Sequence, residues 1–310
     1  MIAVYILLSL LLLVVIAAYA CYRLAFSVPK QGPESIFRTP NTEQYTPYAA
    51  RAKQMIRDAL AIPYEAVSIT SYDGLTLFGK CYPVSPEAPW LIMFHGYHSR
   101  AERDFCGGLP FGTASGFNVL LADQRAHGKS GGRCLTFGIK ERHDCLSWIE
   151  YLRSRAGNTV RIALYGMSMG AATVLMATAL KLPANVCGVV ADCGYSSPSA
   201  IIKKVLRDRH FPLFPTYALI RLGGMLFGGF DLESASAVSA MDQCDIPVLF
   251  IHGGDDRFVP CDMGLENHSH CRSSGKELLL VPGAGHGMNY IADQTSYLHT
   301  VSAFLAKIFA

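Results

Sequence analysis

The distribution of apolar and polar positions along the chain predicts a mixed α/β protein. Apolar runs of strand length recur, and the stretches between them are long enough for helices. The runs lie at 90–95, 117–123, 160–165, 186–192, 247–252 and 278–281. Because runs that are apolar throughout are buried on both faces, we expect a mostly parallel central sheet flanked by helices.

The segments between the runs add detail to this picture. Residues 66–71 and 75–83 flank Asp73-Gly74, a strong hairpin signal. Helices are predicted at 47–61, 142–155, 168–182, 262–273 and 294–309. About 50 residues separate the run at 186–192 from the next run, where a helix and two loops would need far fewer. We therefore predict a helical insertion at about 195–243 that covers one edge of the sheet as a lid.

The first segment of the chain is apolar on every face. Residues 2–22 carry no charge, and at about 1.5 Å per residue they form a helix of roughly 31 Å, the thickness of the hydrocarbon core of a bilayer. We expect a transmembrane anchor at 1–22, a juxtamembrane linker and helix at 23–61, and a folded domain at 62–310 that contains the insertion. A cleavable signal peptide is the alternative, because Ala18-Tyr19-Ala20 has the form of a cleavage site.

Charge is unevenly distributed and favours one orientation of this anchor. The net charge is +3, and residues 23–58 hold six basic and three acidic side chains. By the positive-inside rule, Arg23, Lys30 and Arg38 predict a single-pass membrane protein with its domain in the cytoplasm. Cleavage of a signal peptide would instead place the domain outside the cytoplasm. The rest of the chain is neutral and has no basic run, so we do not expect a nucleic-acid partner.

Cysteine and glycine patterns argue against a metal or a cofactor. The ten cysteines are scattered with no Cys-x-x-Cys pair, as in reduced cytoplasmic proteins. Cys261, Cys271 and the histidines between them match no zinc spacing. Gly128-Lys129-Ser130 resembles the end of a phosphate-binding loop, but Asp123 stands where that loop needs glycine. We therefore expect neither a metal nor a cofactor.

One motif carries a specific chemical expectation. Gly166-Met167-Ser168-Met169-Gly170 follows an apolar run and opens a predicted helix. In a strand–turn–helix, this pattern lifts the serine hydroxyl above the sheet edge at a helix N-terminus. A glycine-rich turn with an N-capping serine explains the motif equally well when it is taken alone.

Two later loops favour the catalytic interpretation. Asp255 and Asp256 follow one apolar run, and His286 follows the next. A serine becomes a nucleophile when a histidine takes its proton and a carboxylate orients that histidine. Because each loop lies at the C-terminal end of a parallel strand, all three meet at one rim of the sheet. We predict a triad of Ser168, His286 and an acid, for which Asp255, Asp256 and Asp192 all remain candidates.

The loop after the first long run predicts an oxyanion hole. Acyl transfer needs two backbone N–H donors aimed at the developing oxyanion. Tyr97, in the segment His95-Gly96-Tyr97, and Met169, which follows the serine, are suitably placed to supply them. His95 is expected to fix its loop, and Arg125 and His127 to tie the next loop to its neighbours.

Together these motifs resemble the α/β-hydrolases, and within them the serine-aminopeptidase-like and lysophospholipase-like group, from about residue 65 to the C-terminus. The resemblance rests on His95-Gly96, Asp123-x-Arg125-x-His127-Gly128-x-Ser130, Gly166-x-Ser168-x-Gly170, His252-Gly253-x-x-Asp256-x-x-Val259-Pro260 and Gly285-His286. It implies the α/β-hydrolase fold and a serine hydrolase, similar to membrane-anchored bacterial members. The family pattern places the acid at Asp256.

The group includes esterases, lipases, thioesterases and peptidases, so the substrate must be argued from this chain. The alternatives to an esterase are an aminopeptidase-like serine peptidase and a thioesterase or acyltransferase with the same triad. A binding protein with the same fold but no activity is the least favoured alternative, because no triad member is missing. Residues 211–230 are rich in large apolar side chains. If part of this insertion lines the pocket, Phe211, Phe214, Tyr217 and Met225 would form an apolar slot for an acyl chain. We therefore expect a small acyl substrate, an uncharged ester of short to medium chain length.

Overall fold

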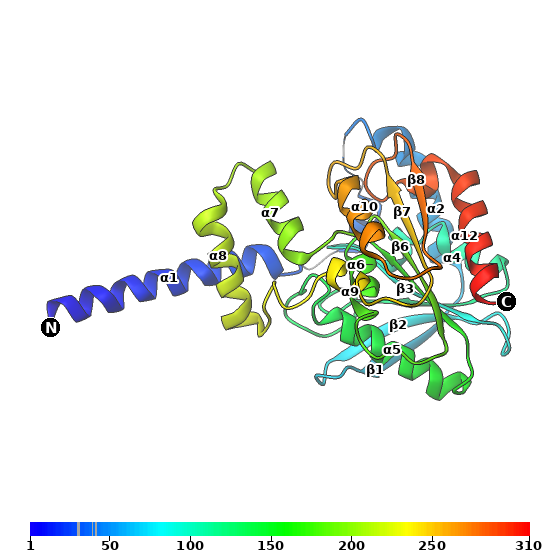
Figure 1. The fold of residues 1–310 in the computed structure, drawn as a ribbon, viewed down its shortest axis with the longest axis horizontal. Coiled ribbons are helices and arrows are strands. Elements are labelled where there is room, and N and C mark those ends of the chain that lie inside the picture. Colours follow the sequence, from blue (N-terminus) through cyan, green and yellow to red (C-terminus); the bar gives the residue numbers. More distant parts are fainter. Residues whose placement is uncertain (30–31, 39, 41) are drawn as a thin grey trace.

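A computed structural model of the chain describes residues 1–29, 32–38, 40 and 42–310. Its centre is an eight-stranded sheet of order β1-β2-β4-β3-β5-β6-β7-β8 (Figure 1). The strands are β1 Glu65–Thr70, β2 Thr76–Tyr82, β3 Trp90–Phe94, β4 Asn118–Ala122, β5 Ile162–Met167, β6 Val186–Asp192, β7 Val248–Gly253 and β8 Glu277–Val281. Strand β2 pairs antiparallel with β1 and β4, and the remaining pairs are parallel. The predicted mostly parallel sheet is confirmed.

Alternate side chains of the central strands enter two hydrophobic cores, one on each face of the sheet. On β3, Trp90 and Ile92 belong to the core shared with helices α5 Glu141–Ala156 and α6 Met169–Ala177. Leu91 and Met93 belong to the opposite core, which α4 Gly108–Ala114 and α12 Gln294–Ile308 cover. Such strands are buried on both faces, which explains their continuous apolar runs.

The remaining helices include some that the sequence pattern predicted and some that it did not. They are α2 Ala49–Ala61, α3 Ala101–Asp104, α7 Pro198–Asp208, α8 Leu213–Gly223, α9 Ala237–Met241, α10 Cys261–His270 and α11 Asn289–Ala292, with short helices at Pro33–Phe37, Thr46–Tyr48 and Gly224–Gly228. The helix predicted at 168–182 is shorter, because α6 ends at Ala177. Helix α4 was not predicted, since Gly108, Pro110 and Gly112 lower its helix propensity.

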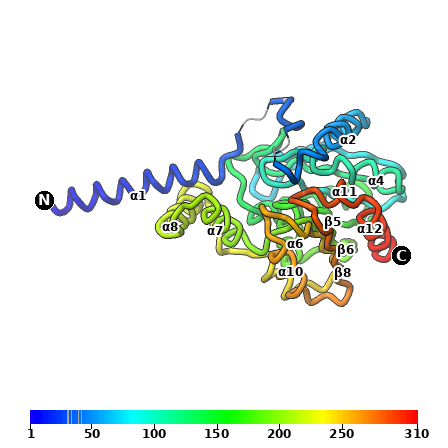
Figure 2. Tube along the Cα trace, turned by 90° about the horizontal axis from the view of Figure 1, so that it is seen from above, coloured from blue at the N-terminus to red at the C-terminus, as the bar shows by residue number. Residues whose placement is uncertain are grey.

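The first helix, α1, spans Ile2–Phe26 and projects from the folded domain (Figures 1 and 2). It is the one helix among the described residues that is long and apolar enough to cross a membrane. It runs four residues beyond the predicted boundary at Tyr22, and its last turn enters the fold. Phe26 is fully buried, with its ring edge-on to Phe137 and Phe230. Lys30, one of the predicted juxtamembrane charges, lies outside the described residues.

The insertion after β6 lies elsewhere than expected. Helices α7 and α8 and the π-helical turn Gly224–Gly228 extend away from the sheet, and α8 packs across α1 (Figures 1 and 2). Close approach of α8 to α1 is possible at Gly223, where a Cβ atom would overlap the backbone of Ala18. The insertion is therefore helical, as predicted, but it packs against the N-terminal helix.

Candidate active site

Ser168 occupies a sharp turn between β5 and α6 that only small neighbours allow. Its φ is 55°, in the left-handed region that non-glycine residues seldom adopt. A side chain at Gly170 would overlap the carbonyl of Phe94, and one at Gly166 would overlap the carbonyl of Gly170. The two glycines of the motif thus let β3, β5 and α6 approach closely enough to hold the serine at the sheet edge.

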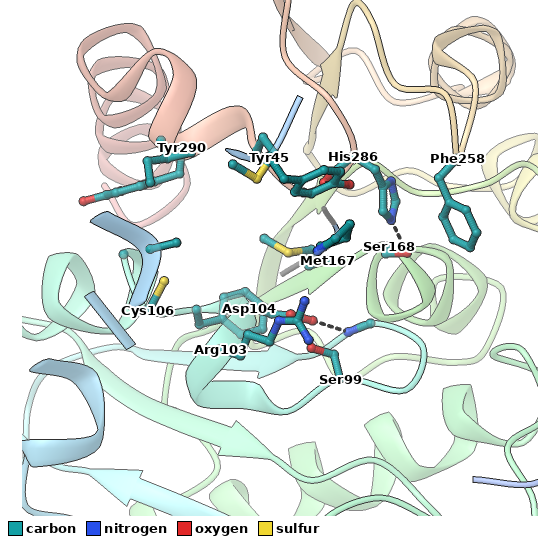
Figure 3. A pocket seen from close by; sticks show the side chains of 18 of the residues that line it. Tyr45, Ser99, Arg103, Asp104, Cys106, Met167, Ser168, Phe258, His286 and Tyr290 are labelled. Atoms are coloured by element: carbon teal, nitrogen blue, oxygen red, sulfur yellow. Dashed lines mark hydrogen bonds between the residues drawn. The ribbon is translucent and has the colours of Figure 1, made fainter. Parts of the chain in front are cut away.

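Ser168, His286 and Asp256 lie in one hydrogen-bonded line. His286 Nε2 is 2.9 Å from Ser168 Oγ (Figure 3). On the other side of the ring, His286 Nδ1 is 2.7 Å from Asp256 Oδ2. With the proton on Nδ1 donated to the carboxylate, Nε2 is free to accept the serine proton. The structure therefore brings these three predicted residues together in the order that nucleophilic catalysis requires.

Asp256 is held as a carboxylate beneath the histidine. Its Oδ1 accepts hydrogen bonds from the backbone N–H groups of Phe258 at 2.9 Å and Val259 at 2.8 Å. Burial alone would raise the pKa of Asp256, but the neighbouring charge of His286 and hydrogen bonds from His252 and His286 bring that pKa well below its usual range. The group stays ionised, so it can orient the imidazole.

The other two candidate acids have different partners. Asp192 is fully buried and accepts hydrogen bonds from Asn289 at 2.6 Å and from the Tyr297 hydroxyl at 2.8 Å. Burial raises the pKa of Asp192. Asp255 is exposed. Of the three acids that the sequence left open, Asp256 is the one that contacts His286.

Two backbone donors near Ser168 are free. The N–H groups of Tyr97 and Met169 have no hydrogen-bond acceptor among the described residues. The loop that carries Tyr97 is fixed by Asp104, whose Oδ2 accepts from the Gly96 N–H at 2.7 Å and whose Oδ1 accepts from the Ser99 hydroxyl. Asp104, the last residue of α3, was not predicted, because a single acid outside any motif has no distinctive sequence signal. The two free donors lie where an oxyanion hole is expected.

A cavity of about 890 Å³ opens beside Ser168 and His286 (Figure 3). This volume is within the range of small-molecule sites. Apart from the loops that carry Ser168, His286 and the other candidate catalytic groups, its walls come from residues 40 and 42–56, from α3 and the start of α4, from the end of β5, and from α11 and α12. Large apolar or aromatic side chains dominate these walls: Met55, Ile56, Phe105, Tyr165, Met167, Met288, Tyr290, Ile291 and Tyr297.

Comparison with known proteins identifies the family. The model of the family "Serine aminopeptidase, S33" matches residues 86–218. A solved esterase from Pyrococcus furiosus superimposes with a TM-score of 0.63 at 25% identity, covering 81% of this chain and 93% of the esterase. The chain belongs to the α/β-hydrolase superfamily.

Two curated relatives of this α/β-hydrolase extend the comparison. The uncharacterized protein YqkD of Bacillus subtilis is 29% identical over 191 residues, which are 61% of this chain and 62% of YqkD. The matched part thus spans less than two thirds of that relative. The bifunctional esterase/perhydrolase DCH of Acinetobacter calcoaceticus is 25% identical over 268 residues, covering 71% of this chain and 92% of DCH.

The cavity of this α/β-hydrolase is not lined by the residues that the sequence predicted. Phe211, Phe214, Tyr217 and Met225, the expected slot residues, are not among the residues that line it. Phe214 is 83% exposed, and the Tyr217 hydroxyl bonds to Glu233 at 2.5 Å. The predicted slot is therefore wrong: the insertion packs against α1 and leaves several of its large apolar side chains exposed.

Residues ahead of the domain take the place predicted for the insertion. Gln44, Tyr45, Ala52, Met55 and Ile56 all line the cavity. The Tyr45 hydroxyl donates to the carbonyl of His286 at 2.8 Å, and the Gln44 amide donates to the carbonyl of Asp255 at 2.7 Å. The part of the chain interpreted as a linker therefore forms a wall of the candidate site. We call residues 42–56 the N-terminal cap.

The loop residues with expected structural roles have them. His95 Nε2 accepts from the Gln124 N–H at 3.1 Å, and His127 Nε2 accepts from the His98 N–H at 3.2 Å. Arg125 binds Asp144 through two hydrogen bonds of 2.7 and 2.6 Å. The two histidine contacts join the loops after β3 and β4, and so support the position of Tyr97, while Arg125 ties the loop after β4 to α5.

One group of side chains lies close enough together to ligate an ion. The ligand atoms of Cys193, Asp256 and His286 all lie within 4.8 Å of one another. Asp256 and His286 are already hydrogen-bonded to each other, and that bond accounts for their proximity. An ion bound there would compete with the orientation of His286 toward Ser168.

Proposed function

We propose that this α/β-hydrolase is a membrane-anchored serine hydrolase that cleaves carboxylic esters through an acyl-enzyme on Ser168. The observation that carries the proposal is the hydrogen-bonded line from Ser168 Oγ through His286 to Asp256 beside a largely apolar cavity. The two esterase relatives, one of known structure, support the same reaction class.

The geometry supports a two-stage acyl transfer. His286 Nε2 takes the proton of the Ser168 hydroxyl as Oγ attacks the ester carbonyl, and the N–H groups of Tyr97 and Met169 stabilise the oxyanion. When the intermediate collapses, the proton passes to the departing alkoxide. Water then gives a proton to His286 as it attacks the acyl-enzyme, and the acid is released with the Ser168 proton restored.

Features of the cavity favour an uncharged ester over the amino terminus of a peptide. An aminopeptidase needs a carboxylate free to bind the substrate ammonium group. The lining contains two carboxylates, Asp104 and Glu43. Both oxygens of Asp104 already accept hydrogen bonds, and Glu43 is exposed to solvent, where an ion pair contributes little. Arg103 also lines the cavity and has no ion-pair partner among the described residues, so it would repel that ammonium group. Apolar walls suit an acyl chain.

The anchor is part of the same proposal. Residues 1–22 would span the bilayer, 23–61 would connect and cap, and 62–310 would form the catalytic domain, with Arg23 and Arg38 favouring the cytoplasmic side. Packing supports an uncleaved anchor over a signal peptide. Ala18 and Tyr22 are buried against the insertion, and the carbonyl of Phe26 accepts from the Leu135 N–H at 3.0 Å.

The test is labelling and turnover of the full-length chain in detergent. We expect a fluorophosphonate probe to label the wild type and not Ser168→Ala. A parallel screen compares p-nitrophenyl esters with acyl thioesters and aminoacyl anilides, which separates the esterase from the thioesterase and aminopeptidase alternatives. Faster cleavage of an anilide or a thioester than of any ester would overturn the substrate class. If the wild type were neither labelled nor active, the proposal that the protein is a serine hydrolase would be wrong.

A further inference from the structure

The insertion after β6 presents an unusual apolar surface to the exterior of the molecule. Six large apolar side chains between residues 211 and 227 are more than one third exposed: Phe211, Leu213, Phe214, Met225, Leu226 and Phe227. Three of them lie at or just before the start of α8, and three lie in the turn Gly224–Gly228 that follows it. Soluble proteins seldom leave so many large apolar groups of one short segment in water, and such segments mark interaction sites. We call these six side chains the insertion patch.

The patch is continuous with the apolar surface of α1. Phe227, in the π-helical turn that follows α8, contacts both Tyr19 and Tyr22, with ring centroids 5.0 and 5.8 Å apart. Gly223 lets the backbone of α8 approach Ala18, in the manner of small residues between helices in membranes. The insertion and the N-terminal helix thus share one exposed apolar surface.

The position along α1 at which α8 makes this contact indicates how deep α8 would lie in a bilayer. A hydrocarbon core of about 30 Å needs about 20 helical residues, which counted from Ile2 end near Cys21. Helix α8 crosses α1 at Ala18 to Tyr22, just at that boundary, and it runs across α1 (Figures 1 and 2). A helix that crosses a spanning helix at this level lies along the membrane surface.

The flanking charges suit the same position. The last turn of α7 carries Arg207, and the connection to α8 carries Arg209; both are exposed beside the patch. Asp208 between them is paired with Lys204. Arginines next to an apolar face that dips into a bilayer are typical of interfacial helices, because they attract anionic head groups.

We propose that α8 and the turn after it form a second membrane contact, with the insertion patch immersed at the boundary between head groups and acyl chains. The N-terminal helix and the insertion would then hold the domain at two points, which fixes its orientation on the bilayer surface. This inference goes beyond the proposed ester hydrolysis and does not depend on it. It does rest on α1 spanning the membrane, so the experiment tests α1 separately.

The test places single tryptophans in the full-length protein reconstituted in vesicles of phosphatidylcholine and phosphatidylglycerol. The two native tryptophans, Trp90 and Trp148, are buried and give a constant background. Phe214→Trp and Leu226→Trp report on the patch. Leu8→Trp reports on α1, and Tyr72→Trp, on the exposed hairpin turn between β1 and β2, is the matched surface control.

Lipids that carry a nitroxide near the head group or near the chain end then quench fluorescence by depth. We expect head-group nitroxide to quench the two patch tryptophans at least about twofold more than Tyr72→Trp, and the chain-end nitroxide to act most on Leu8→Trp. Quenching of Leu8→Trp without quenching of the patch would overturn the inference and leave the anchor intact. Absence of quenching at all positions would overturn both.

Acrylamide, a water-soluble quencher, identifies the competing occupant. If the patch tryptophans are shielded from acrylamide and from both nitroxides, a second copy of the chain covers the patch and the inference is wrong. If acrylamide quenches them as strongly as it quenches Tyr72→Trp, the patch lies in water, and the inference is equally wrong.

Discussion

The hydroxyl of Tyr45 donates a hydrogen bond to the backbone carbonyl of His286, 2.8 Å away, and so links the N-terminal cap to the loop of the candidate base. Burial raises the pKa of Tyr45 strongly, so its hydroxyl remains a donor at any physiological pH. Gln44 makes a parallel bond to the carbonyl of Asp255, next to the candidate acid. The cap therefore holds both loops that follow the last two strands.

The first prediction tests this link. Tyr45→Phe removes the hydrogen bond while keeping the ring in the cavity wall, and the loss of about 1 kcal/mol should lower kcat/KM for a p-nitrophenyl ester about fivefold. Tyr48→Phe is the matched control, since the hydroxyl of Tyr48 has no hydrogen-bond partner among the described residues. Equal kcat/KM values for the two variants would show that the cap does not position His286.

The cap also shows why a sequence pattern predicts where a helix lies in the chain better than it predicts which part of the protein the helix packs against. The helix at 47–61 was predicted from its amphipathic spacing, and α2 is present at Ala49–Ala61. Spacing tells which face of a helix is buried and says nothing about the surface against which it is buried. The polar segment before it, with Tyr45, resembles a linker in composition, and its contacts are with residues some 240 positions later.

The apolar residues of the insertion also show that a packing partner is hard to predict from local sequence. Its clustered apolar residues predicted an acyl slot at the mouth of the site, but the structure places the insertion against α1 and leaves much of its apolar surface exposed. The contact with α1 could not be predicted, because α1 had already been interpreted as surrounded by lipid. By contrast, the Gly166-x-Ser168-x-Gly170 turn was predictable, since its glycines are required by sterics within the turn itself.

The second prediction concerns the division of labour around Ser168. Ser168→Ala and His286→Ala should each lower kcat by about 10⁵-fold or more, and the double variant should lose little more, because the residues act as a unit. Asp256→Asn should cost about 10⁴-fold, since the imidazole loses its orienting carboxylate.

Asp192→Asn is the control for the choice of acid. Asp192 bonds to Asn289 and Tyr297 and does not contact His286, so kcat should fall by no more than about tenfold. All variants are compared by initial rates after their thermal unfolding has been matched to the wild type. A larger loss in folded Asp192→Asn than in folded Asp256→Asn would reverse the assignment.

The third prediction follows from the buried His127. Burial, aided by the neighbouring His95, lowers the pKa of His127 to about 3. An unfolded histidine takes up a proton near pH 6.5, so between about pH 6.5 and 3 the unfolded state binds a proton that the folded state does not. The free energy of unfolding should therefore decrease as the pH falls through this interval, by up to about 1.4 kcal/mol per pH unit from this group.

Chemical denaturation between about pH 4.5 and 7 measures the effect. His127→Gln keeps an acceptor for the His98 N–H but cannot titrate, so the dependence of its unfolding free energy on pH should be shallower than that of the wild type by up to one proton. His299→Gln, at an exposed histidine, is the control substitution with which the slope of His127→Gln is compared. An unchanged slope in His127→Gln would mean that this imidazole is charged in the folded protein.

The last prediction uses acyl chain length to locate the substrate slot. Each methylene buried in the cavity should contribute up to about 0.8 kcal/mol, so kcat/KM should rise with chain length until the cavity is full and then fall. Ala52 lines the cavity from α2, and Ala52→Phe would fill part of it, so the optimum should shift to a shorter chain. Ala50→Phe, on the same helix but exposed and outside the lining, should keep the wild-type optimum. Met225→Ala should also keep it, because the insertion does not line the cavity. If the optimal chain length shifted in Met225→Ala and not in Ala52→Phe, the insertion would form the slot. A kcat/KM profile that falls from acetate onward would contradict an acyl slot altogether.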